Sequence, residues 1–142
     1  MQGMTDKSNN SFSGSHAEIT GKILKRAFEV QNSLGCGFLE KVYENAMMVA
    51  MKRMGLEAIS QVPLRVHFKD VLVGEYIADI VVAGAVPVEI KAAQENPRIH
   101  VAQVLNYLKA TGLRVGMLLN FGLPKVYYRR LELRNDGSYA AY

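Results

Sequence analysis

The sequence predicts an α/β domain in which helices flank a mixed β-sheet. Three observations predict it: helical apolar periodicity near the N-terminus, a strand-like middle, and a helix followed by two strands near the C-terminus. The expected order is helix, helix, a meander of about three strands, helix, strand, strand. The chain has 142 residues, 49% of them hydrophobic and 21% charged, so one domain with a sizeable core is expected.

The first two elements are predicted to be helices. Residues 17–34 carry one apolar helical stripe, made of Ile19, Ile23, Ala27, Val30 and Leu34. The sequence GCG at 35–37 should end this helix. A second helix is expected over residues 39–54, with Gly55 as its stop.

The middle and the second half read as strands with one intervening helix. Residues 64–69 alternate apolar and polar side chains, which is typical of a strand with one buried face, and Lys69-Asp70 marks a turn. A helix is expected between Pro97 and Gly112, because its apolar residues recur at helical spacing. Further strands are predicted at 71–82, 86–93, 115–122 and 125–133.

The ends of the chain and its composition limit the functional classes. Residues 1–15 are polar and are predicted to be a disordered leader, residues 16–135 the single domain, and residues 136–142 a C-terminal tail. No apolar run is long enough to cross a membrane, so no membrane partner is expected. Cys36 is the single cysteine and is expected to be an incidental loop residue, and a cytoplasmic location fits. The net charge of +4 permits a polyanionic partner without requiring one.

Two of the predicted strands carry an unusual set of charges: Asp79 on one strand, and Glu89 and Lys91 on the next. Buried strands rarely hold charges unless those charges pair or perform chemistry. If the hairpin loop is Ala83-Gly84-Ala85, Asp79 falls opposite Glu89 and all three charges lie together. A two-residue loop at Gly84-Ala85 would shift the register by one and put Asp79 on the other side from Glu89.

The charged set supports two interpretations. Two close carboxylates favour a divalent cation such as Mg²⁺, which takes one or two carboxylates together with water and phosphate oxygens. A neighbouring lysine can orient an attacking water or stabilise charge that develops on phosphorus. That set of groups is suited to phosphodiester hydrolysis. The alternative is a structural ion pair between Lys91 and either Asp79 or Glu89, and spacing alone does not decide between them.

Three motifs together resemble the GxxExxY proteins, a branch of the PD-(D/E)xK nuclease superfamily. The first is GFLEKVY at 37–43, the second is Asp79 with EIK at 89–91, and the third is the stretch 100–122, in which Gln103 and Tyr107 form a Q-x3-Y spacing. The resemblance covers roughly residues 17–135. Its superfamily core, helix, three-strand meander, helix, strand, agrees with the order predicted above.

The resemblance implies a role for each matching position. Asp79 and Glu89 would bind Mg²⁺ or Mn²⁺, with the Ile90 carbonyl as a further ligand and Glu40 as the supporting helix carboxylate. Lys91 would be the catalytic lysine. The implied substrate-side residues are Tyr43, His100, Gln103 and Tyr107. Several of them could instead have a purely structural role. Glu40 could complement the helix dipole, Tyr43 could pack in the core, and His100 could be a surface residue.

The function predicted on this basis is metal-dependent hydrolysis of DNA or RNA phosphodiester bonds. The alternative is a catalytically silent nuclease fold that binds nucleic acid or a protein partner. Nucleic acid is the expected partner, and a homo-oligomer would supply binding surface that so short a chain lacks. Basic residues gather in the second half, where they could follow a phosphate backbone: Arg98, Lys109, Arg114, Lys125, Arg129, Arg130 and Arg134.

Overall fold

The computed structural model describes residues 14, 16–95 and 98–142, and this part of the chain forms three helices and six strands. In chain order they are α2 (Ala17–Leu34), α3 (Glu40–Arg53), β1 (Ala58–Phe68), β2 (Val71–Val82), β3 (Val86–Lys91), α4 (Ile99–Thr111), β4 (Val115–Asn120), β5 (Tyr127–Leu133) and β6 (Tyr139–Ala141). The predicted leader, residues 1–15, lies outside the described residues except for Gly14. No helix in the described ranges is long and apolar enough to cross a membrane.

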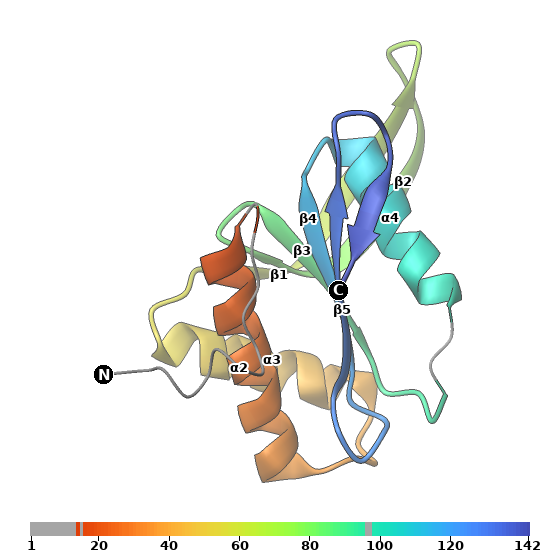
Figure 1. Cartoon of the computed structure of the whole chain (residues 1–142). Helices are drawn as coiled ribbons and strands as arrows, with labels where there is room; N and C mark the ends of the chain where they lie inside the picture. Colours follow the sequence, from red (N-terminus) through yellow and green to blue (C-terminus); the bar gives the residue numbers. More distant parts are fainter. Residues whose placement is uncertain (1–13, 15, 96–97) are drawn as a thin grey trace.

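The strands form one mixed sheet in the order β1-β2-β3-β4-β5-β6. Neighbouring strands are antiparallel except for β3 and β4, which α4 connects in parallel. Figure 1 shows α2 and α3 on one side of the sheet and α4 on the other. The predicted α/β fold with a mixed sheet flanked by helices is therefore confirmed.

Strand β6 lies within residues 136–142, where no strand was predicted. Residues 139–141 pair antiparallel with β5, with Leu131 opposite Ala141 and Leu133 opposite Tyr139. A strand of three residues is too short to show an alternating pattern in the sequence, and only its pairing with β5 defines it. β1 begins at Ala58, ahead of the alternating residues 64–69.

The core has one layer on each side of the sheet. The predicted stripe of α2 packs with α3 against the side chains of Ile80, Val88 and Ile90. Helix α4 covers the opposite face with Val104 and Leu108, which contact Leu118 and Leu131. Since side chains alternate along a strand, Glu89 and Lys91 project from the α4 face of β3.

Asn120 fixes the chain between β3 and α4. Its Oδ1 accepts hydrogen bonds from the backbone N–H of Ala93 (2.9 Å) and of Gly122 (3.0 Å), and its Nδ2 donates to the Ala93 carbonyl (3.1 Å). Gly122 passes against the backbone of Ala92 and Ala93 with no room for a side chain. These contacts hold the segment that follows Lys91, and with it the end of β3 that carries the charged residues.

Candidate functional site

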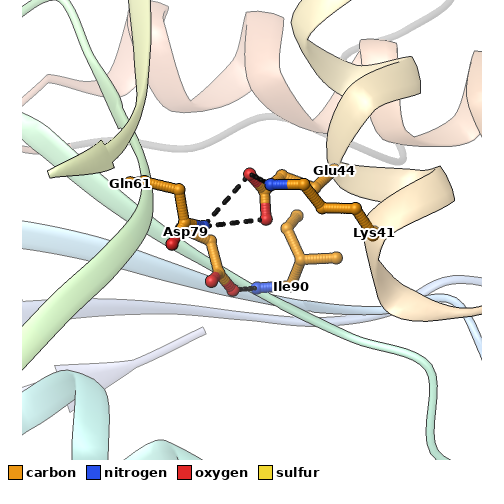
Figure 2. Close-up of polar contacts among 5 residues, drawn as sticks. All are labelled: Lys41, Glu44, Gln61, Asp79 and Ile90. Atoms are coloured by element: carbon orange, nitrogen blue, oxygen red, sulfur yellow. Dashed lines mark hydrogen bonds and ion pairs between the residues drawn. The ribbon is translucent and has the colours of Figure 1, made fainter.

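The register of the β2–β3 hairpin brings the predicted charges together. Val82 pairs with Val86 and Ile80 with Val88, so the loop is residues 83–85 and Asp79 falls opposite Glu89. The three-residue loop is therefore the one present, and Asp79 and Lys91 both lie near enough to Glu89 to act on its pKa. The regular ladder ends at the Ile80–Val88 pair, and beyond it the Asp79 Oδ2 accepts a hydrogen bond from the Ile90 N–H at 2.8 Å (Figure 2).

The Ile90 carbonyl faces the same gap. In an extended strand, the N–H and C=O of one residue point toward the same neighbouring strand. The Ile90 N–H points toward Asp79 on β2, so its carbonyl does as well. Lys91 shows the opposite orientation, because its carbonyl accepts from the Phe121 N–H on the β4 side (2.8 Å). A carbonyl and two carboxylates therefore converge where β2 leaves β3.

Glu89 has an unsatisfied buried oxygen. The residue is 5% exposed, and its Oε2 lies 3.3 Å from the Lys91 Nζ. Its Oε1 is buried without a hydrogen-bond partner among the described residues. A buried acceptor without a partner is costly and rare, so it indicates a position for a ligand.

The electrostatics of the gap also favour a cation. Burial, and then the charge of Asp79, raise the pKa of Glu89 to about 7, although Lys91 acts in the opposite direction. Burial also raises the pKa of Asp79, opposed by the Ile90 N–H, and the charge of Glu44 raises it further. The two carboxyls resist simultaneous ionisation unless positive charge lies between them. Carboxylate and carbonyl oxygens are the ligands that Mg²⁺ and Mn²⁺ prefer, so the donor set fits such an ion.

Three predicted residues of α4 form a hydrogen-bonded chain beside this gap. Gln103 Nε2 donates to the Tyr107 hydroxyl at 2.9 Å, and Gln103 Oε1 lies 3.4 Å from His100 Nδ1. Tyr107 is 2% exposed, and its ring packs against Tyr76 with centroids 5.2 Å apart. Burial, and then the charge of Glu89, raise the pKa of Tyr107 to about 12, which places its hydroxyl within the field of the site.

Two residues that the sequence did not single out also belong to this region: Glu44 on α3 and Gln61 on β1. Glu44 is 5% exposed, and both of its carboxylate oxygens accept from Gln61 Nε2 at 3.1 Å (Figure 2). Lys41 Nζ also donates to Glu44 at 3.0 Å. Glu44 lies four residues after Glu40, on the same helix face, and this spacing was the available signal. Nothing in the sequence around Gln61 indicates its role.

Gln61 interrupts the β1–β2 ladder opposite Asp79. The pairs Ser60–Ile80 and Val62–Ala78 flank it, but Gln61 itself is unpaired and has a positive φ of 56°. Such a conformation is strained for a residue with a side chain and persists only where its surroundings impose it. The bonds to Glu44 supply that constraint.

Glu40 and Tyr43 lie differently from the other predicted residues. Glu40 is exposed in the first turn of α3, and its charge raises the pKa of Asp79 less than that of Glu44 does. No group of three His, Cys, Asp or Glu side chains in the described ranges is arranged to hold a metal, so Glu40 is not assembled with Asp79 and Glu89 as a third ligand. Tyr43 is buried, stacks on Phe121, and bonds through its hydroxyl within the 35–38 loop, which is a packing position.

The positive φ of Gln61 leads to a test with two matched variants. Both Gln61→Gly and Gln61→Val remove the bonds to Glu44, but only glycine adopts a positive φ without strain. The free energy of unfolding of the valine variant should therefore be lower than that of the glycine variant by about 1–2 kcal/mol, although valine is normally favoured in strands. Urea unfolding of the two variants measures this difference. A valine variant as stable as the glycine variant would show that the backbone at Gln61 does not need this conformation.

The comparison with known protein families agrees with this geometry. The model of the family described as the PD-(D/E)XK nuclease superfamily matches residues 17–131, which include every site residue named above. No curated protein and no solved structure gives a significant match to the chain.

Proposed function

Because the chain belongs to the PD-(D/E)XK nuclease superfamily, we propose that it hydrolyses phosphodiester bonds of DNA or RNA, with Mg²⁺ or Mn²⁺ at the gap between β2 and β3. The observation that carries the proposal is Glu89: a buried carboxylate with one unpaired oxygen, opposite Asp79 and beside Lys91. The G-x-x-E-x-x-Y motif at residues 37–43 supports placing this chain in the GxxExxY branch of the superfamily.

Asp79, Glu89 and the Ile90 carbonyl are the groups that would hold the ion. When bound, such an ion supplies a Lewis acid for a phosphoryl oxygen and lowers the pKa of water. Asp79 is held for this task by the Ile90 N–H, and Glu89 directs its unpaired oxygen into a buried space. Glu40, exposed at the start of α3, would act through its charge.

Lys91 is the group that assists the attack. Its Nζ lies 3.3 Å from Glu89, and its side chain is 17% exposed, so its charge acts in a largely dry surrounding. An ammonium in this position donates to the attacking water or to a phosphoryl oxygen as negative charge grows there. Breaking its bond to Glu89 frees Lys91 for this contact.

The chain of residues on α4 orients the substrate side of the site. With a pKa of about 12, Tyr107 keeps its proton at neutral pH, so it serves as a hydrogen-bond donor and not as a base. Gln103 holds the Tyr107 hydroxyl, and His100 extends the chain toward the start of α4. These three groups are placed to steady a phosphate oxygen near Glu89.

One observation favours a second candidate, a catalytically silent module that binds nucleic acid or a protein. The ion pair between Lys91 and Glu89 is already closed, as the structural interpretation of these charges requires. In that case the charges form only an internal ion pair, and the protein binds a partner without cleaving it. Homo-oligomerisation and a cytoplasmic location stay predictions.

The deciding experiment is cleavage of labelled single- and double-stranded DNA and RNA with Mg²⁺ or Mn²⁺, compared between wild type and Lys91→Ala. Metal-dependent cutting by the wild type and none by the variant is expected. Salt-sensitive binding without cutting by either protein would favour the silent module instead. Cutting that survives in the variant would assign the activity to another site or to a contaminant.

A further inference from the structure

A groove of about 690 Å³ runs between α4 and the strands β5 and β6. Its lining consists of Arg98, Val101, Ala102, Leu105, Tyr127, Arg129, Tyr139 and Ala141. These residues include two arginines and two tyrosines, and no acidic side chain is among the described residues that line it. The groove is therefore positive and partly aromatic.

The floor of the groove lies on the same sheet face as the charged pair of β3. Lys91 pairs with Asn120, which pairs with Tyr127, and Glu89 pairs with Leu118, which pairs with Arg129. Residues directly opposite one another in paired strands project from the same face. Tyr127 and Arg129 thus stand in the same two rows as Lys91 and Glu89, two strands and roughly 10 Å away.

Helix α4 stands between the candidate site and the groove, and its N-terminus is where they meet. The residues that line the groove follow one helix stripe, and His100, Gln103 and Tyr107 follow the opposite one. Since α4 runs back from the end of β3, its first residues lie at the end of the sheet that carries Lys91. Arg98, at the start of α4, is the groove residue nearest to that junction in the chain.

The two arginines are presented for an anion. Arg129 lies over the Tyr127 ring, 5.5 Å from its centroid, and its Nε donates to the Tyr127 hydroxyl at 3.0 Å. That contact fixes the guanidinium and leaves its terminal nitrogens without a partner in the described part of the chain. Arg98 is exposed and makes no ion pair with a described residue. A guanidinium held in this way matches a phosphate group.

We propose that this groove binds a single-stranded nucleic-acid segment that flanks the bond to be cut, with Arg98 and Arg129 on the phosphates and Tyr139 against a base. The proposal rests on the proposed nuclease function, because it names the substrate's path from the site. Tyr139 is 49% exposed, so its ring is accessible to an unpaired base. Stacking on an aromatic ring beside a positive groove is how proteins hold single strands, whereas paired bases present no free face.

The test measures binding without cleavage. Fluorescence anisotropy of labelled oligothymidylate and oligouridylate in EDTA gives the affinity over a series of salt concentrations. The double variant Arg98→Gln/Arg129→Gln should bind at least about tenfold more weakly, and its slope of log affinity against log salt should be shallower by about 1.4, since each phosphate contact to a single strand contributes about 0.7. Arg53→Gln is the matched control, because Arg53 is exposed at the end of α3 on the other side of the sheet. It should bind as the wild type does.

The stacking contact has its own variants. Tyr139→Ala should weaken binding about fivefold or more, and Tyr139→Phe should leave binding unchanged. Circular dichroism and urea unfolding check that both variants keep the overall fold and stability of the wild type. A loss shared by the Ala and Phe variants would assign the effect to the hydroxyl and overturn the stacking contact.

The outcomes separate this proposal from the proposed function. No binding by the wild type, equal binding by the double variant, or tighter binding of a duplex of matched length overturns the groove. If the wild type cleaves nucleic acid and the groove variants keep the KM of the wild type, the groove proposal is wrong and the nuclease proposal is supported. If the variants lose binding and the wild type cleaves nothing, binding in the groove is supported and the nuclease proposal is wrong.

Discussion

Replacing Gly122 with alanine is expected to lower the free energy of unfolding by more than about 3 kcal/mol, or to prevent folding. A Cβ at this position would lie 2.3 Å from the Ala93 carbonyl oxygen and 2.5 Å from the Ala93 nitrogen. Both are backbone atoms, and Ala93 is held by Asn120, so neither partner can move aside. Urea unfolding followed by circular dichroism measures the loss.

Gly74→Ala is the matched control for Gly122→Ala. Gly74 lies in β2, where a Cβ would meet no atom within 4 Å and where the backbone φ is not positive. Its substitution should change the free energy of unfolding by no more than about 1 kcal/mol. Equal stability of the two variants would mean that the 92–93 segment does not pack against Gly122 in solution.

The stability of the metal-free protein should fall as pH rises from 4.5 to 7, and Glu89 should cause part of that fall. Its pKa is about 7 in the folded chain, against an ordinary value of 4.5. Between these values the folded state keeps a proton that the unfolded state has lost, so deprotonation favours unfolding. The contribution of Glu89 is most favourable below pH 4.5 and is lost by pH 7, a change of about 2–3 kcal/mol.

The comparison with Glu89→Gln isolates this effect. The variant cannot titrate at position 89, so its free energy of unfolding should decline less between pH 4.5 and 7 than that of the wild type. Denaturant unfolding in EDTA at several pH values measures both curves. Parallel curves would show that Glu89 does not keep its proton in the folded chain. If Mg²⁺ binds here, it should stabilise the wild type more strongly at pH 8 than at pH 5, because its ligands must be ionised.

Most of the fold was predictable because its signals are local. The stripe of α2, the alternation before Lys69-Asp70 and the glycine after α4 each reflect one element, and the helices and strands appear near the expected positions. The sequence between the two strands allowed only two loops, residues 83–85 or 84–85, and the first of these predicts that Asp79 lies opposite Glu89. β6 was missed because three residues carry no periodicity, and only the edge of β5 gives them a partner.

The parts of the site that sequence reasoning missed depend on contacts between distant segments. Glu44 and Gln61 are 17 residues apart and meet only because α3 packs beside β1. The positive φ of Gln61 follows from that contact and from its place opposite Asp79, neither of which the residue type reveals. Tyr43 belongs to a recognisable motif, yet the motif does not say whether the ring faces a substrate or the core, and the structure buries it.

The short loop at residues 83–85 has a consequence for how this chain tolerates insertions and deletions. Removing one residue there would shift β2 against β3 by one position, which would put Asp79 on the other side of the sheet from Glu89. Length changes at this turn are thus constrained by parity: an odd change separates the two carboxylates, whereas insertions at the distal turn after Phe68 leave their alignment intact. Among natural variants, this turn should keep an odd number of residues even where the residues themselves differ.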